Sequence, residues 1–243
     1  MGGGDAEPGV PVMKGAVLVG LIASVFALSA AATASGSQAR RAKACPVPDS
    51  GTCRGVLAAG TYRSRSFRPR LTFTVPRKWA NYLDIPGLYL LQPPGAKPPG
   101  NFITGSFIGL ETSVAPEASD CQSAVSGVKR TPKAIVKWMR TRGSLVVRHV
   151  QAVTLGCLKG LVFDVRMRRG AKGCLSVGAT QRAAPLLVGV GPSSFDHEVA
   201  PHYAERHYLL RYKRGTLDVA LVDSSGGKKL ASFNKIASKF NFG

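Results

Sequence analysis

Short apolar runs, separated by glycines and basic turns, fill residues 144–224 and constrain the fold more than any other feature of the chain. The runs are SLVVRHV, GLVFDVRM, CLSVGAT, PLLVGVG and RHYLLRYKRGTLDVALVDS. Their length and their content of branched and aromatic residues are typical of strands. The last run turns at Lys213, Arg214 and Gly215 and therefore predicts a β-hairpin.

The sequence upstream predicts further strands. In residues 71–75, Leu, Phe and Val alternate with threonines, which is the period of a half-buried strand, and Pro76 ends it. Residues 87–111 hold two short apolar runs around a loop rich in Pro and Gly. This pattern predicts a hairpin with a long exposed tip.

Two segments have the features of helices. Thr131 can cap a helix over residues 131–143, Pro132 suits its first position and Gly143 suits its end. Residues 228–240 carry apolar side chains near helical spacing and predict a closing helix. Because strands outnumber helices and seldom alternate with them, the expected fold class is α+β, an antiparallel β-sheet with two or three packed helices.

The N-terminus has the order of an export signal. Lys14 precedes an uncharged apolar run over residues 15–36, and this run contains Ala32-Thr33-Ala34, a small-x-small cleavage motif. An uncleaved membrane anchor is the alternative, since the run approaches the roughly 20 residues that span a bilayer. Both interpretations make the protein secreted or extracytoplasmic.

These features divide the chain into three regions. Residues 1–34 are the expected signal peptide or membrane anchor, with Met1 and Met13 both open as the true start. Residues 35–56 are basic and rich in Gly, Ser and Pro, and they predict a linker with one small disulfide loop. Residues 57–243 are expected to form a single α+β domain.

Five cysteines fit an oxidising compartment and leave one thiol over. Cys45 and Cys53 lie close in sequence around turn-forming residues and are expected to pair. Cys121 and Cys174, both beside loop-like sequence, are the second expected pair. Cys157 is then the free thiol, with a small buried apolar role as the alternative. No CxxC occurs, which argues against structural zinc and thioredoxin-type redox chemistry.

Lysine and arginine dominate the charged residues, with 33 against 13 Asp and Glu and a formal net charge of +20. The positive electrostatic field of so basic a protein attracts an anionic envelope polymer or a membrane surface. No nucleic-acid fold signature occurs, so no specific nucleic acid binding is expected. Dispersed solvated charge on a basic secreted protein is the alternative interpretation. The candidate anion-binding residues are Arg63, Arg65, Arg68, Arg70, Lys133, Lys137, Arg140, Arg166, Arg168 and Arg169.

Histidines recur every five residues at His197, His202 and His207, with acidic residues between them. A zinc protease helix needs two histidines four apart, whereas steps of five leave successive side chains about 140° apart around a helix. On one strand, an odd step sends neighbours to opposite faces. The prediction is therefore solvated loop histidines, with no metal site, no cofactor and no enzyme activity. A metal-dependent hydrolase using residues 197–207 is the alternative.

The segments LTFTVPRKW, TPKAIVKWM, QAVTLGCLKGLVFDVRM and SKFNFG together resemble uncharacterised exported proteins of high-GC Gram-positive bacteria. More distantly, they resemble the PsbP-like fold, which includes mycobacterial LpqN-type lipoproteins. The chain departs from that pattern at Lys78, at Cys157 and in lacking a lipobox before Cys45. The resemblance implies a binding or assembly accessory protein and transfers no catalytic residue.

The sequence thus predicts an exported, non-enzymatic protein of the cell envelope or the extracellular space that binds a ligand. Electrostatic binding of anionic envelope polymers or lipid is a second hypothesis. The sequence leaves the ligand and the oligomeric state open.

Overall fold

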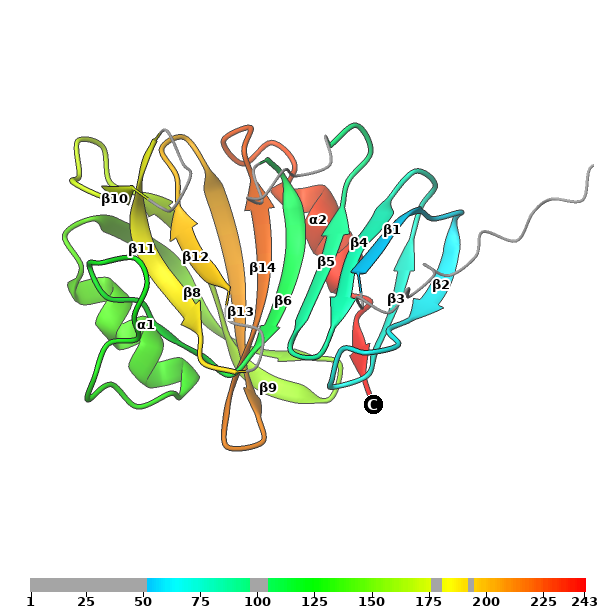
Figure 1. The fold of residues 1–243 in the computed structure, drawn as a ribbon, viewed down its shortest axis with the longest axis horizontal. Coiled ribbons are helices and arrows are strands. Elements are labelled where there is room, and N and C mark those ends of the chain that lie inside the picture. Colours follow the sequence, from blue (N-terminus) through cyan, green and yellow to red (C-terminus); the bar gives the residue numbers. More distant parts are fainter. Residues whose placement is uncertain (1–51, 97–104, 176–180, 192–194) are drawn as a thin grey trace, which may run out of the picture. The chain divides into compact units, whose positions relative to one another are not determined.

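The computed structural model describes residues 52–96, 105–175, 181–191 and 195–243 (Figure 1). The expected signal region, most of the expected linker, Cys45 and the tip of the hairpin predicted over residues 87–111 lie outside these ranges.

An eight-stranded antiparallel sheet forms the centre of the described chain, in the order β1-β4-β5-β6-β14-β13-β9-β8. Its strands are β1 (Thr52–Val56), β4 (Ala80–Ile85), β5 (Leu88–Gln92), β6 (Phe107–Thr112), β8 (Leu145–Leu155), β9 (Leu158–Met167), β13 (Ala204–Tyr212) and β14 (Gly215–Asp223). The two hairpins predicted from the sequence appear as β5 with β6 and β13 with β14.

Two smaller sheets and two helices complete the described fold. One sheet joins β7 (Val114–Pro116), β10 (Cys174–Leu175), β11 (Arg182–Gly189) and β12 (Asp196–Val199). The other joins β2 (Gly60–Arg63), β3 (Leu71–Val75) and β15 (Asn241–Phe242). The helices are α1 (Pro132–Thr141) and α2 (Leu230–Ala237).

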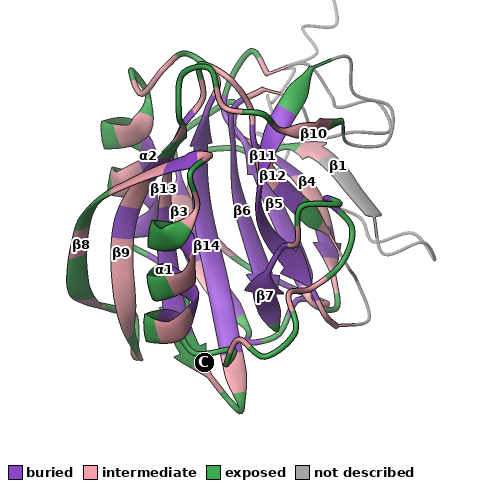
Figure 2. Cartoon of the chain, turned by 90° about the vertical axis from the view of Figure 1, so that its left-hand side faces the viewer, coloured by how far each residue is buried: buried purple, intermediate pink, exposed green. Residues whose placement is uncertain are grey.

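The two faces of the central sheet are covered by different elements. Tyr208 and Leu210 of β13 belong to a cluster of buried side chains that includes residues of α2 and β3. Leu209 points to the other face and packs with residues of α1, β7, β11 and β12. Because side chains alternate along a strand, β13 contributes to both cores, and Figure 2 shows the central strands buried along most of their length.

Helix α1 begins as its sequence predicts. The side chain of Thr131 accepts a hydrogen bond from the backbone N–H of Ala134 at 3.4 Å, and Pro132 occupies the first turn, where no backbone N–H is needed. The helix ends at Thr141, before the predicted stop at Gly143. Its buried face includes Ile135, Val136 and Met139.

The fold is mostly antiparallel sheet, consistent with the α+β prediction, and the two helices of the described chain are short. One boundary differs from the prediction, because residues 52–56 of the expected linker form β1 and pair with β4. Within the described ranges, no helix is long and apolar enough to cross a membrane.

Strand β8 lies at one edge of the central sheet and is irregular. Its register with β9 shifts between Arg148 and Gln151, and His149 has a left-handed backbone (φ 52°) at this bulge. The exposed His149 imidazole lies 2.8 Å from the carboxylate of Asp164 on β9. The bulge therefore interrupts the regular backbone pairing of β8 with β9 near the middle of β8.

Candidate functional site

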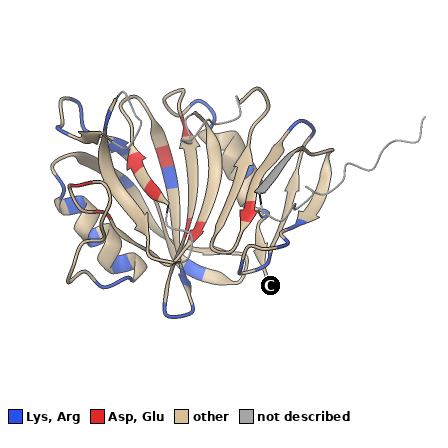
Figure 3. Cartoon of the chain, viewed as in Figure 1, with Lys and Arg blue, Asp and Glu red and all other residues tan. Residues whose placement is uncertain are grey.

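Acidic and basic side chains differ in how far they are buried in this fold. Figure 3 shows Lys and Arg on α1, on loops and at the tip of the β13–β14 hairpin, whereas acidic residues also occur within the central strands. The buried carboxyl groups are those of Asp84, Glu111, Glu117, Glu205, Asp218 and Asp223. No Lys or Arg is buried anywhere in the described ranges. The surface is consequently more basic than the net charge alone suggests.

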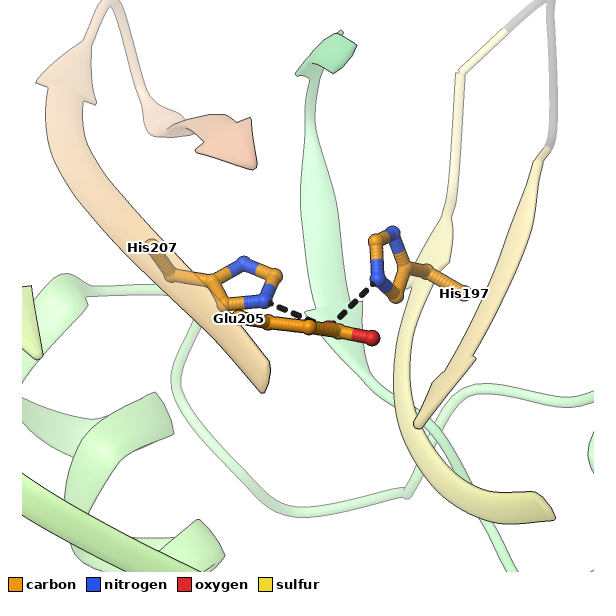
Figure 4. A group of neighbouring side chains, drawn as sticks. All are labelled: His197, Glu205 and His207. Atoms are coloured by element: carbon orange, nitrogen blue, oxygen red, sulfur yellow. Dashed lines mark hydrogen bonds and ion pairs between the residues drawn. The ribbon is translucent and has the colours of Figure 1, made fainter. Parts of the chain in front are cut away.

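Two buried histidines join two buried carboxylates in one hydrogen-bonded chain. His207 Nδ1 lies 3.0 Å and 3.1 Å from the two carboxylate oxygens of Asp218, and its Nε2 lies 3.0 Å from Glu205 Oε2. His197 Nε2 lies 2.9 Å from the same Glu205 oxygen. One carboxylate oxygen of Glu205 therefore lies within hydrogen-bond distance of both imidazole rings, as Figure 4 shows.

The strands explain why these side chains meet. Glu205 and His207 are two residues apart on β13 and point to the same face. Asp218 on β14 lies opposite Leu209, which shares that face, two residues beyond His207. His197 lies on β12. The chain turns back between β12 and β13, and this turn brings His197 close to Glu205. The cluster thus spans a turn between the central sheet and a smaller one.

Burial and mutual attraction set the charges of the cluster. Burial alone would raise the pKa of Glu205, but His197 and His207 outweigh this effect and lower the pKa to about 2. Burial likewise disfavours the charged form of His207, yet Asp218 and Glu205 raise its pKa to about 10. Glu205 is therefore a carboxylate at neutral pH.

Glu111 extends the polar region on the same face, opposite Asp218 on the neighbouring strand. Its Oε1 accepts a hydrogen bond from the backbone N–H of Phe195 at 3.0 Å. Burial raises the pKa of Glu111 well above its ordinary value, and Asp218 adds to the rise. A Cβ atom at Gly189 would lie 1.9 Å from Glu111 Oε1, so only glycine leaves room for this carboxyl group.

The prediction of solvated histidines is wrong for His197 and His207, which are 6% and 0% exposed. It treated residues 197–207 as one continuous element, whereas a turn separates two strands and brings the ends together. His202 lies in that turn, is exposed and has a left-handed backbone (φ 68°), so the prediction describes this residue alone.

Another buried carboxyl group lies directly after β7. Glu117 is fully buried, and its Oε2 accepts a hydrogen bond from the backbone N–H of Leu186 at 3.1 Å. Burial, followed by repulsion from Glu198, raises the pKa of Glu117 to about 9. Cys121 lies close to both carboxyl groups, but its sulfur is bonded to Cys174 and is not free to bind a metal.

Replacing Glu117 is expected to change how stability depends on pH. The folded pKa of about 9 exceeds the ordinary value of 4.5, so folding is favoured below pH 4.5 and loses about 1.4 kcal/mol per pH unit as pH rises toward 9. Glu117→Gln removes this titration. Between pH 5.5 and pH 7.5, the free energy of unfolding of the variant, measured in urea, should rise by about 3 kcal/mol relative to that of the wild type. If the free energy of unfolding changed with pH to the same extent in both proteins, the pKa of Glu117 would not be raised.

A basic hollow with a volume of about 590 Å³ lies beside the turn at the tip of the β13–β14 hairpin. It is lined by Arg68, Pro86, Gly87, Thr112, Ser113, Arg130, Tyr212, Lys213, Arg214 and Gly215, a set with four cationic side chains and no acidic one. The buried hydroxyl of Thr216 donates to the carbonyl oxygen of Arg130 at 2.8 Å. This bond fixes the segment before α1 to the hairpin.

The candidate anion-binding residues fall in separate places, and Arg68 alone among them lines the hollow. Lys133, Lys137 and Arg140 are exposed on α1. Arg166 donates to the carbonyl oxygen of Gly226 at 3.0 Å. Arg168 donates to that of Gly143 at 2.8 Å. The sequence did not single out Arg130, because the residue becomes part of a cationic group only through the fold.

The carboxylate of Asp84 holds the loop that carries Arg68. It accepts hydrogen bonds from three successive backbone N–H groups, those of Arg65, Ser66 and Phe67, at 2.6, 3.0 and 2.8 Å. One nitrogen of the Arg68 guanidinium donates to the carbonyl oxygens of Arg65 and Phe67. The loop is thus fixed by a buried acceptor, and Arg68 keeps further donors for the hollow.

The predicted disulfide between Cys121 and Cys174 is present. It ties the loop after β7 to β10 and fits an oxidising compartment. Cys157 is free and exposed, so the alternative of a small buried residue is wrong. The partner expected for Cys53 is Cys45, which lies outside the described residues.

Comparison with solved structures finds distant structural neighbours of this chain. No family model and no curated protein matches the chain. The solution structure of cyanobacterial PsbP (CyanoP) from Synechocystis sp. PCC 6803 is similar at 12% sequence identity, over 79% of this chain and 98% of that chain, with a TM-score of 0.37. Similarity at this level carries no information about function.

Proposed function

We propose that this chain is an exported, non-enzymatic binding protein of the cell envelope or the extracellular space, and that its ligand is an anionic polymer. The basic hollow carries this proposal, because four cations from three separate segments line it without an acidic neighbour. Its volume of about 590 Å³ lies in the usual range for a ligand site.

The surroundings of the hollow favour an extended ligand over a single small anion. Arg65 and Arg70 are exposed on the loop that carries Arg68, and Arg63 is exposed at the end of β2. Cations that continue beyond a hollow attract successive charges of a chain such as a phosphodiester polymer. Export is supported by the disulfide and by the apolar segment that follows Lys14.

A metal-dependent hydrolase has less support. A catalytic metal keeps one coordination position open to water or substrate. The side chains of His197, Glu205 and His207 are 7%, 0% and 0% exposed, so this cluster offers a substrate no approach.

Neutralising the hollow is expected to weaken binding of inorganic polyphosphate, used as a probe polymer, by about tenfold at low salt, since each exposed ion pair contributes up to about 1 kcal/mol. The variant is Arg130→Gln/Lys213→Gln/Arg214→Gln. The matched control, Lys133→Gln/Lys137→Gln/Arg140→Gln, removes the same charge from α1 and should lose less than about threefold. Fluorescence anisotropy at several salt concentrations measures both.

Two results would contradict this function. Equal losses in both variants would mean that dispersed charge, and not the hollow, binds the polymer. A wild-type protein that fails to bind polyphosphate at low salt would exclude an anionic polymer of this class.

A further inference from the structure

We infer that His197, Glu205 and His207 form a closed zinc site that joins the smaller sheet to the central one. This site is separate from the basic hollow, and it would stabilise the fold without taking part in ligand binding.

The three donor atoms already have nearly the spacing that zinc requires. One ligand atom from each of the three side chains lies within 4.8 Å of the other two, and Glu205 Oε2 is 2.9 Å from His197 Nε2 and 3.0 Å from His207 Nε2. Ligands about 2.0–2.1 Å from a tetrahedral zinc ion lie about 3.3 Å apart. Small side-chain shifts would therefore admit the ion between the imidazoles, which approach Glu205 from β13 and β12 (Figure 4).

Asp218 gives one imidazole the support that metal-binding histidines usually have. Its carboxylate oxygens lie 3.0 Å and 3.1 Å from His207 Nδ1, so a proton on Nδ1 leaves Nε2 as the lone-pair donor to the ion. The ring of Phe163 stacks on His207 with centroids 5.5 Å apart. The orientation of His207 is thus fixed by a carboxylate at one end and by a ring on one face.

One oxygen in the cluster is left without a hydrogen bond. Glu205 is 1% exposed, and its Oε1 has no hydrogen-bond partner within the described chain. A buried carboxylate oxygen without a partner is costly, and a cation beside it removes that cost. Oε1 can supply a fourth donor if Glu205 binds zinc through both oxygens.

The composition of the site favours zinc over hard cations. Two imidazole nitrogens and a carboxylate are ligands that zinc accepts readily, whereas Ca²⁺ and Mg²⁺ prefer oxygen alone. A divalent ion also neutralises the two negative charges of Glu205 and Asp218 when both imidazoles are uncharged. The absence of CxxC argued against structural zinc, but this donor set needs no thiolate.

The test is the metal content and the thermal stability of the full chain, exported without a histidine tag. We expect about one zinc per chain by mass spectrometry, and removal by dipicolinate should lower the melting temperature by roughly 5 °C or more. His197→Gln should lose the zinc, whereas His202→Gln, which changes the exposed histidine of the neighbouring turn, should keep it.

Asp218→Asn is the second variant and separates the zinc site from a simple folding defect. It should remain folded and bind zinc about 10-fold to 100-fold more weakly, because the orientation of His207 depends on this carboxylate. Wild-type protein that retains no zinc after dialysis against a zinc-containing buffer would overturn the inference. The cluster would then be a network of hydrogen bonds between histidines and carboxylates that binds no metal. Zinc retained equally by wild type and His197→Gln would also exclude this site.

Discussion

Glu205→Gln is expected to lower the free energy of unfolding by about 3–5 kcal/mol even in a buffer that contains a chelator. Glu205 is fully buried and receives His197 and His207 on one oxygen. The amide keeps the shape of the side chain but removes the charge that both imidazoles face. Removing one partner of a buried ion pair is strongly destabilising, and the amide takes from His197 the carboxylate that it faces, whereas His207 keeps Asp218.

Urea unfolding in EDTA measures this loss without a contribution from bound metal. Asp196→Asn is the matched control, because Asp196 is an exposed acidic residue beside His197 and should change stability by less than about 0.5 kcal/mol. A loss below about 1 kcal/mol for Glu205→Gln would show that the cluster is not ionised as described.

Removal of the Cys121–Cys174 disulfide is expected to cost about 4 kcal/mol, because the bond closes a loop with a sequence separation of 53 residues. The cost arises mainly in the unfolded chain, whose freedom the bond restricts. Cys121→Ser/Cys174→Ser, compared with the oxidised wild type by urea unfolding, measures it.

Cys157→Ser provides the control for this disulfide, since Cys157 is exposed and unpaired and its replacement should be nearly neutral. An equal loss in both proteins would mean that Cys157 takes part in a bond of its own. Unchanged stability of the double variant would mean that the bond between Cys121 and Cys174 does not form in the folded protein.

Much of the fold could be predicted, because its local signals agree with the packing. Alternation at residues 71–75, the cap at Thr131 and the turn at Lys213 each depend on neighbours in sequence, and each appears in the structure. The end of the linker could not be predicted, since β1 is a strand through its pairing with β4. A polar, glycine-containing segment carries no such signal.

The buried cluster could not be predicted, because its geometry is not a property of one segment. His197 and His207 are ten residues apart, and they meet only because the chain reverses between two strands of different sheets. Asp218 joins them through the register of β13 with β14. The one local signal was the pair Glu205 and His207, whose spacing of two places both on the same face of a strand.

The charge pattern shows a similar limit. Net charge could be counted from the sequence, but the burial of six carboxyl groups within the described residues could not be predicted from it. These buried carboxyl groups add little negative charge to the protein surface. The electrostatic field at the surface is therefore more positive than the composition indicates.

The bulge in β8 has a consequence for how copies of this protein meet at high concentration. A long, regular edge strand offers its free backbone groups to the edge of another molecule, and such pairing leads to aggregation. The left-handed residue His149 breaks the regular spacing of those groups, and the neighbouring Arg148 is a charge that a second copy would have to approach. The irregular edge therefore disfavours pairing of this strand with the sheet of a second copy.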